Sequence, residues 1–152
     1  MYDDLVMEHI KNARNYRVLD AAGRIAVGTN PLCGDEVRLY LELKDERIAD
    51  LAFQCSCCGI SMASASILTE TAKGAPVEDA RRMIRDFIAM LEDPATQPAA
   101  TTRVEWIAML DTVRRFPARA RCALLPWTTA ADALEPSLTP GPSPGGRGEL
   151  GP

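Results

Sequence analysis

The sequence lacks the features of nucleic-acid-binding, membrane and secreted proteins. Its formal net charge is -4 and its pI is about 5.0, whereas binding to nucleic acid through phosphates requires a basic surface. Charged residues interrupt every apolar stretch before the roughly 18 residues that a membrane helix needs, and the opening Met1-Tyr2-Asp3-Asp4 is acidic where a signal peptide is basic. We therefore expect a cytoplasmic protein whose partner is a protein or a small ion, with no contact to nucleic acid or membrane.

Histidine is nearly absent as well. The single one is His9, which lies with Leu5, Val6 and Ile10 on the apolar face of a predicted N-terminal helix. A lone histidine on such a face is more often a satisfied packing residue than a metal ligand. We expect it to pack in the core.

The composition fits one globular domain followed by a short tail. The 152 residues are 47% hydrophobic and 25% charged, which is the balance of a folded, soluble protein. From residue 136 to residue 152 the sequence is rich in proline and glycine and has almost nothing to bury. We expect residues 1–135 to fold as one domain and residues 136–152 to be disordered.

Two kinds of hydrophobic periodicity predict an α+β fold. Alternating apolar residues predict three short strands that turns join into an antiparallel meander. These strands cover about residues 25–27, 36–43 and 47–54. A helical period then predicts four helices after the sheet. They begin near Cys58, Pro76, Val104 and Phe116.

Five cysteines are present, and their arrangement differs from that of a disulfide framework. The number is odd, and three of them crowd into Cys55-Ser56-Cys57-Cys58. In a reducing cytoplasm such a set is more often metal-binding or reactive. Adjacent Cys57 and Cys58 could not bridge each other without strain.

The predicted hairpin brings most of these cysteines to one end of the sheet. In an antiparallel pair, the start of one strand lies beside the end of the next, so Cys33 and Asp35 should meet Cys55, Cys57 and Cys58. Gly34 gives the backbone the freedom to direct its two neighbours. Cys58 should begin a helix, whose N-terminal partial charge stabilises a thiolate.

Cys122 is the remaining candidate for a tetrahedral zinc site, which three thiolates and a carboxylate would complete. The basic residues around it could offset the negative charge of such a site. They are Arg114, Arg115, Arg119 and Arg121. Pro126 lacks the N–H that would bond the Cys122 carbonyl, so we expect a kink or a fresh helix start there. From the residues alone, the cysteines are either metal ligands or small buried hydrophobic residues.

Three motifs decide between these readings. They are Asn30-Pro31-Leu32-Cys33-Gly34-Asp35, Cys58-Gly59-Ile60-Ser61-Met62-Ala63-Ser64-Ala65-Ser66 and Phe116-Pro117-Ala118-Arg119-Ala120-Arg121-Cys122. Their order and spacing resemble the three-cysteine pattern of the IscU/NifU N-terminal scaffold family over about residues 2–134. The resemblance is greatest to the SufU branch, because Arg121 stands where the IscU pattern has a histidine ligand and because residues 92–115 resemble the insertion that SufU members carry.

The resemblance implies a three-stranded antiparallel sheet covered by helices and a role in iron–sulfur cluster assembly. It implies that the ligands hold zinc, or alternatively a transient [2Fe–2S] cluster. The implied ligands are Cys33, Asp35, Cys58 and Cys122. The implied partners are a SufS-type cysteine desulfurase, which would deliver sulfur, and other iron–sulfur assembly proteins. We expect Cys33 to accept the sulfur, since a glycine-flanked loop is more mobile than a helix and a thiolate must be reachable to attack.

Other roles remain open. Cys55 and Cys57 stand where the family usually has glycine, and they are auxiliary ligands, a relay for persulfide or incidental. In a structural zinc module the cysteines would hold metal without reacting. In a thiol-disulfide redox protein, the cluster from Cys55 to Cys58 would itself be the reactive group.

Overall fold

The computed structural model of the chain describes residues 3–20, 22–32, 34–93 and 102–135. Cys33 and the predicted tail of residues 136–152 lie outside the described residues. The described elements follow one another in the order helix, three strands, four helices. They are α1 (Asp4–Lys11), β1 (Arg24–Asn30), β2 (Asp35–Lys44), β3 (Arg47–Ser56), α2 (Gly59–Ala72), α3 (Val77–Glu92), α4 (Val104–Val113) and α5 (Pro117–Leu134).

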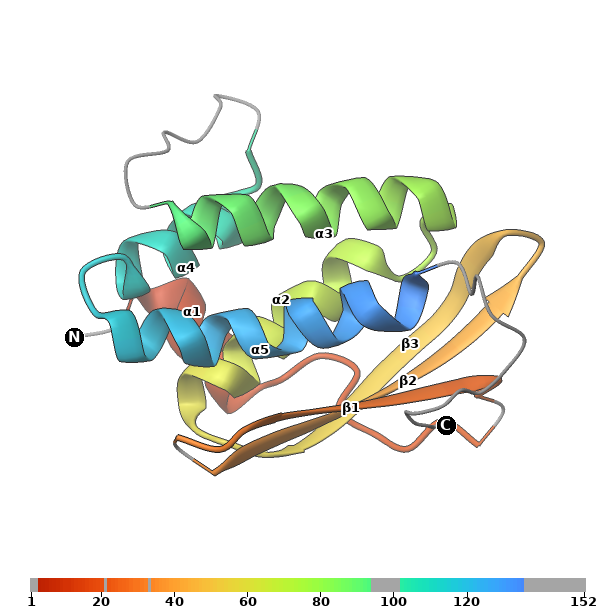
Figure 1. The fold of residues 1–152 in the computed structure, drawn as a ribbon, viewed down its shortest axis with the longest axis horizontal. Coiled ribbons are helices and arrows are strands. Elements are labelled where there is room, and N and C mark those ends of the chain that lie inside the picture. The colour runs from red at the N-terminus through yellow and green to blue at the C-terminus, as the bar shows by residue number, and fades with distance from the viewer. Residues whose placement is uncertain (1–2, 21, 33, 94–101, 136–152) are drawn as a thin grey trace.

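The predicted meander is confirmed. The three strands form one antiparallel sheet in the order β1-β2-β3. The helices gather on one side of this sheet (Figure 1), so the architecture is the expected α+β one. Along β2, Val37, Leu39 and Leu41 are buried because they face the helices, and Phe53 and Leu51 of β3 lie on the same face.

Helix α2 lies at the centre of the helical layer. Small side chains let neighbouring elements approach it closely, and residues on nearly every side of it are buried, among them Ser61, Ala63, Ser64 and Ala65. Its hydroxyl groups find partners in the helix beside it: Ser64 Oγ donates to the Ala123 carbonyl of α5 and accepts from Trp127 Nε1 at 2.9 Å. Helix α2 is therefore buried on nearly all sides, whereas its sequence pattern predicted burial on one face.

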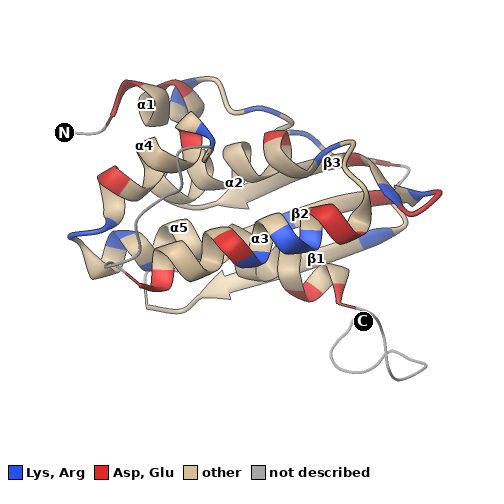
Figure 2. Ribbon diagram, turned by 90° about the horizontal axis from the view of Figure 1, so that it is seen from above, with Lys and Arg blue, Asp and Glu red and all other residues tan. Residues whose placement is uncertain are grey.

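Helix α3 is the amphipathic outer helix. Ala80, Ile84, Phe87 and Leu91 are buried, and Phe87 packs against the rings of Trp106 and Trp127. The opposite face carries basic and acidic residues side by side (Figure 2), with ion pairs between residues three apart. The helix begins at Val77 with Pro76 as its N-cap.

His9 packs in the core, as its position predicts. It is 2% exposed, its Nδ1 lies 2.6 Å from Ser66 Oγ, and its Nε2 lies 3.6 Å from Glu70 Oε1. Burial lowers the pKa of the imidazole, and Arg14 lowers it further. No helix in the described part of the chain has the length and apolar character to cross a membrane.

Helix α5 differs from the expectation. The predicted fresh helix start near Cys122 is wrong, because α5 continues from Pro117 to Leu134 with Pro126 inside it. The reason is a substitute hydrogen bond: Ser61 Oγ lies 2.9 Å from the Cys122 carbonyl oxygen and donates to it in place of the missing N–H of Pro126. The helix can therefore carry Cys122 and the buried Trp127 on one rigid element.

Candidate metal centre

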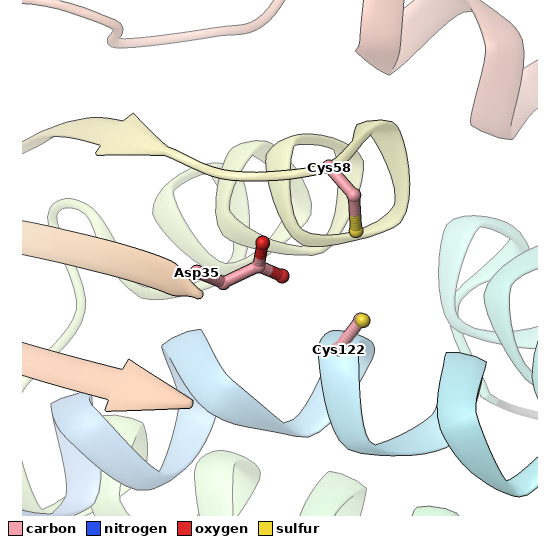
Figure 3. Close-up of side chains that lie close together, drawn as sticks. All are labelled: Asp35, Cys58 and Cys122. Atoms are coloured by element: carbon pink, nitrogen blue, oxygen red, sulfur yellow. The ribbon is translucent and has the colours of Figure 1, made fainter. Parts of the chain in front are cut away.

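Three side chains from three elements point to a common centre. Asp35 is the first residue of β2, Cys58 is the N-cap of α2 and Cys122 lies in the first half of α5. One carboxylate oxygen and the two sulfur atoms all lie within 4.8 Å of one another. Figure 3 shows the carboxylate and both sulfurs turned toward the same space. We call Asp35, Cys58 and Cys122 the candidate metal centre.

The register of the sheet explains how Asp35 and Cys58 meet. Glu36 of β2 lies opposite Ser56 of β3, so the first residue of β2 and the residues just after β3 occupy the same end of the sheet. Asp35 shares the helix-facing side with Val37, which explains why this carboxylate is only 6% exposed. Cys58 lies two residues after the end of β3 and is exposed.

A tight turn between β1 and β2 directs Asp35. The Asn30 side chain accepts from Leu32 N at 3.2 Å, and the Asn30 carbonyl accepts from Gly34 N at 2.8 Å. Gly34 has a φ of +74°, in the left-handed region that a side chain disfavours. The predicted need for glycine beside Asp35 is thus confirmed by the backbone conformation.

Ser61 connects all three members of the centre, and the sequence analysis missed it. Its Oγ lies 2.9 Å from Asp35 Oδ2, 2.9 Å from the Cys122 carbonyl oxygen and 3.6 Å from Cys58 Sγ. Its single hydroxyl hydrogen can be donated to only one acceptor at a time. Pro126 is the signal in the sequence that could have indicated Ser61, because the Cys122 carbonyl loses its helical donor there and needs a substitute donor nearby.

The donor set suits zinc. Zinc prefers thiolate sulfur and accepts carboxylate oxygen, and two ligand atoms on a tetrahedral zinc lie roughly 3.5 to 3.8 Å apart. The observed separations of up to 4.8 Å need only a small closure. A buried carboxylate is costly unless it is paired or coordinates a metal, so Asp35 fits a cation at this place. The three described side chains would leave one of the four positions for a further ligand.

The other predicted site residues have different places. Cys33 is not among the described residues. Arg121 precedes Cys122 on α5 and is exposed, and the guanidinium of Arg119 lies over the Phe116 ring, 4.2 Å from its centroid. That these arginines offset the charge of the centre stays a prediction.

Cys55 and Cys57 are paired with each other in this structure. They are joined by a disulfide, with Cα atoms 5.4 Å apart, while Cys58 and Cys122 remain reduced thiols. The expectation that Cys57 and Cys58 do not bridge each other is confirmed. The role of auxiliary ligands is not available to Cys55 and Cys57 in the disulfide state, since a metal ligand must be a thiolate.

The sequence was compared with protein families. Residues 1–123 match the family described as the NifU-like N terminal domain. The chain is 36% identical over 127 residues to a protein of Bacillus subtilis (strain 168) named zinc-dependent sulfurtransferase SufU, with 84% of each chain covered. It is 30% identical over 135 residues to an iron–sulfur cluster assembly scaffold protein IscU of Thermotoga maritima, covering 89% of this chain and 93% of that one.

The fold was compared with solved structures. It is similar to the crystal structure of a protein described as an iron–sulfur cluster assembly scaffold for the SUF system, from Fervidobacterium islandicum AW-1. The TM-score is 0.80 at 29% sequence identity, and the match covers 88% of this chain and 96% of the other. The sheet covered by helices is thus the arrangement of this relative too.

Proposed function

This chain belongs to the NifU-like N-terminal domain family, and we propose that it accepts sulfur from a cysteine desulfurase during iron–sulfur cluster assembly, with zinc bound at the candidate metal centre. The observation that carries the proposal is the convergence of one carboxylate and two thiols within 4.8 Å from β2, α2 and α5. The similarity to a relative named zinc-dependent sulfurtransferase, over 84% of both chains, supports it.

Four residues hold the zinc in this proposal. Asp35, Cys58 and Cys122 are the described ligands, and Cys33 is the fourth because it lies two residues before Asp35 in the sequence, next to Gly34. When bound, zinc keeps the thiols deprotonated and ready as nucleophiles. The exposed position of Cys58 fits a site that a partner must approach.

Cys33 is the acceptor in this proposal. Its thiolate attacks the outer sulfur of a persulfide on the desulfurase. The bond between the two persulfide sulfurs breaks, a new bond forms between Cys33 Sγ and the transferred sulfur, and the desulfurase cysteine leaves as a thiolate. We expect the reaction to take place in the cytoplasm, where these thiols stay reduced.

A second candidate function is assembly of a [2Fe–2S] cluster on the same residues. The similarity to relatives named scaffold proteins, including the one from Thermotoga maritima, favours it. Thiolate ligands suit iron and zinc alike. Against it, by the family resemblance, Arg121 occupies the position of a histidine ligand in the IscU pattern.

A structural zinc module is the third candidate. Structural zinc sites are closed, with the metal shielded by its four ligands. Cys58 is exposed, and the buried Ser61 hydroxyl can donate to either of two acceptors. These two features suit a site that must open better than they suit a closed structural site.

Metal analysis of protein purified without air, followed by one round of sulfur transfer, tests the proposal. We expect about one zinc per chain and, for protein whose Cys55–Cys57 bridge is closed, a mass gain of one sulfur atom after mixing with a persulfide-loaded desulfurase. Bound iron with acid-labile sulfide would favour the scaffold, and zinc with thiols that gain no sulfur would favour the structural module.

A further inference from the structure

We propose that Cys55 and Cys57 are a redox-active dithiol that reduces the sulfur accepted by this protein and releases it as sulfide. The inference rests on the proposed function, since it supplies the next step after sulfur acceptance. It concerns two cysteines that the metal site leaves unused.

The geometry of the pair allows it to close and reopen. The two Cα atoms are 5.4 Å apart, inside the roughly 4.4 to 6.8 Å range in which a disulfide forms without backbone movement. Both residues are half-buried, so both are within reach of small reagents. The closed bridge therefore has the ordinary Cα separation of a disulfide.

The pair lies directly beside the candidate metal centre. Cys55 lies opposite Val37 in the β2–β3 ladder. Val37 is two residues after Asp35 on β2. Cys57 is bonded through the backbone to Cys58. The dithiol and the centre are therefore neighbours at the same end of the sheet.

The surroundings give the two cysteines different roles. Cys55 is fixed within β3, because its N–H donates to the Tyr16 hydroxyl at 3.4 Å and its carbonyl accepts from the same hydroxyl at 3.2 Å. Cys57 lies beyond the last residue of the strand, Ser56. We assign Cys57 as the residue that carries the sulfur and Cys55 as the residue that resolves it.

The step balances in atoms and electrons. The Cys57 thiolate attacks the outer sulfur of a persulfide at the centre and takes it over as Cys57–S–SH. The Cys55 thiolate then attacks Cys57 Sγ, so that the Cys55–Cys57 bond forms, the bond from Cys57 Sγ to the outer sulfur breaks, and hydrosulfide leaves. The dithiol loses two electrons and the transferred sulfur gains them. A dithiol reductant, such as dithiothreitol or a protein dithiol, regenerates the pair.

The product has the oxidation state that a cluster requires. A persulfide holds sulfur at the level of elemental sulfur, whereas the bridging atoms of an iron–sulfur cluster are sulfide. A built-in dithiol would supply the two electrons at the place where the sulfur arrives. The disulfide in the structure is the form in which this step would leave the pair.

A single-turnover experiment tests the proposal. The full chain is reduced, freed of reductant without air, and mixed with a desulfurase that has been loaded with cysteine and then desalted. We expect about one sulfide per wild-type chain, together with a mass lower by two hydrogens and a peptide that contains the Cys55–Cys57 bridge. Cys55→Ser should gain one sulfur atom and keep it on Cys57 or Cys33.

Two controls separate the chemistry from the fold. Wild-type protein with the bridge already closed should accept sulfur and release no sulfide. Because this control contains no substitution, it removes the dithiol without changing the sequence. Cys55→Ser and Cys57→Ser should match the wild type in zinc content and melting temperature. Wild-type protein that gains sulfur but releases no sulfide overturns the dithiol assignment while the sulfur acceptor stands. Sulfide release by Cys55→Ser at the wild-type level also overturns the dithiol assignment.

Failure of the proposed function gives a different result. If the loaded desulfurase transfers no sulfur to any form of the chain, the acceptor function fails. The same variants are then mixed with inorganic tetrasulfide, which needs no desulfurase. Sulfide release with bridge formation in the wild type and not in Cys55→Ser supports the dithiol, and equal release from both overturns it.

Discussion

The Ser61 hydroxyl oxygen lies 2.9 Å from the Cys122 carbonyl oxygen, the carbonyl that Pro126 leaves without its helical donor. The same hydroxyl lies 2.9 Å from the Asp35 carboxylate. One hydroxyl of α2 thus lies between the carboxylate of β2 and the α5 carbonyl that Pro126 deprives of its helical donor.

Ser61→Ala should weaken both the fold and the metal site. Loss of the hydroxyl removes a hydrogen bond to the partly buried Cys122 carbonyl, which costs about 0.5–1.5 kcal/mol, and loss of the contact to Asp35 should reduce zinc affinity by roughly 10 to 100-fold. Urea unfolding and competition with a chromogenic chelator measure the two effects. Ser64→Ala is the control, since Ser64 contacts Ala123 and Trp127 instead, and it should lower stability without changing zinc affinity.

A double-mutant cycle isolates the part that Pro126 plays. In Pro126→Ala the new backbone N–H can bond the Cys122 carbonyl, so Ser61→Ala should cost less free energy of unfolding in that background than in the wild type. If the two substitutions are additive, Ser61 does not replace the missing donor.

Gly28→Ala should destabilise the contact between β1 and α5. A Cβ at this position would collide with the Thr129 side chain and lie 3.3 Å from Leu125 Cδ1, so the two elements must separate slightly at a cost of about 1–3 kcal/mol. Gly23→Ala is the matched control, because a Cβ there meets nothing within 4 Å. Thermal unfolding compares the two, and equal melting temperatures would contradict the close approach.

His9 should make the protein less stable as the pH falls. Burial, with help from Arg14, lowers the pKa of His9 below its ordinary value of 6.5 while Glu70 opposes the shift, so the unfolded chain takes up this proton first. The contribution of His9 is therefore complete above about pH 6.5 and is lost as the pH falls below that value. Urea unfolding at several pH values measures it. His9→Asn should flatten the pH dependence just below about pH 6.5, and an unchanged slope in this variant would contradict the assignment.

Removal of the metal should lower the melting temperature. Ligand bonds that are absent from the unfolded chain contribute to folding, so a chelator should destabilise the zinc-loaded protein. The double variant Cys58→Ala, Cys122→Ala should bind no zinc, whereas Cys55→Gly, Cys57→Gly should bind it as the wild type does. Zinc retained stoichiometrically by the first variant, or lost from the second, would mean that other cysteines hold the metal.

The sheet and the meeting of Asp35 with Cys58 were predictable because they follow from local periodicity. Alternation along residues 36–43 set the helix-facing side, and a hairpin of that register brings the two residues to one end of the sheet. The turn at Gly34 was predictable as well, because glycine readily adopts the positive φ that this residue has in the structure.

What the sequence could not provide depends on contacts between distant elements. Pro126 predicted a kink or a fresh helix start near Cys122, because the sequence of the helix by itself contains no substitute donor for the Cys122 carbonyl. That donor, Ser61, lies 61 residues away in the chain. The disulfide between Cys55 and Cys57 was not predicted, because three cysteines within four positions do not reveal from sequence alone which pair closes.

The central claim is that this chain accepts sulfur on Cys33 at a zinc site, and mapping of the transferred sulfur tests it most directly. Wild-type protein and Cys33→Ser, each with the Cys55–Cys57 bridge closed, are mixed with a cysteine desulfurase and cysteine, and the sulfur is located by intact-protein and peptide mass spectrometry. Serine is a far poorer nucleophile than a thiolate and cannot form a persulfide, so the variant should stay folded and gain no sulfur. We predict persulfide that depends on Cys33 in the wild type and none in Cys33→Ser. A wild-type protein that gains no sulfur, or a Cys33→Ser protein that gains as much as the wild type, would contradict the account.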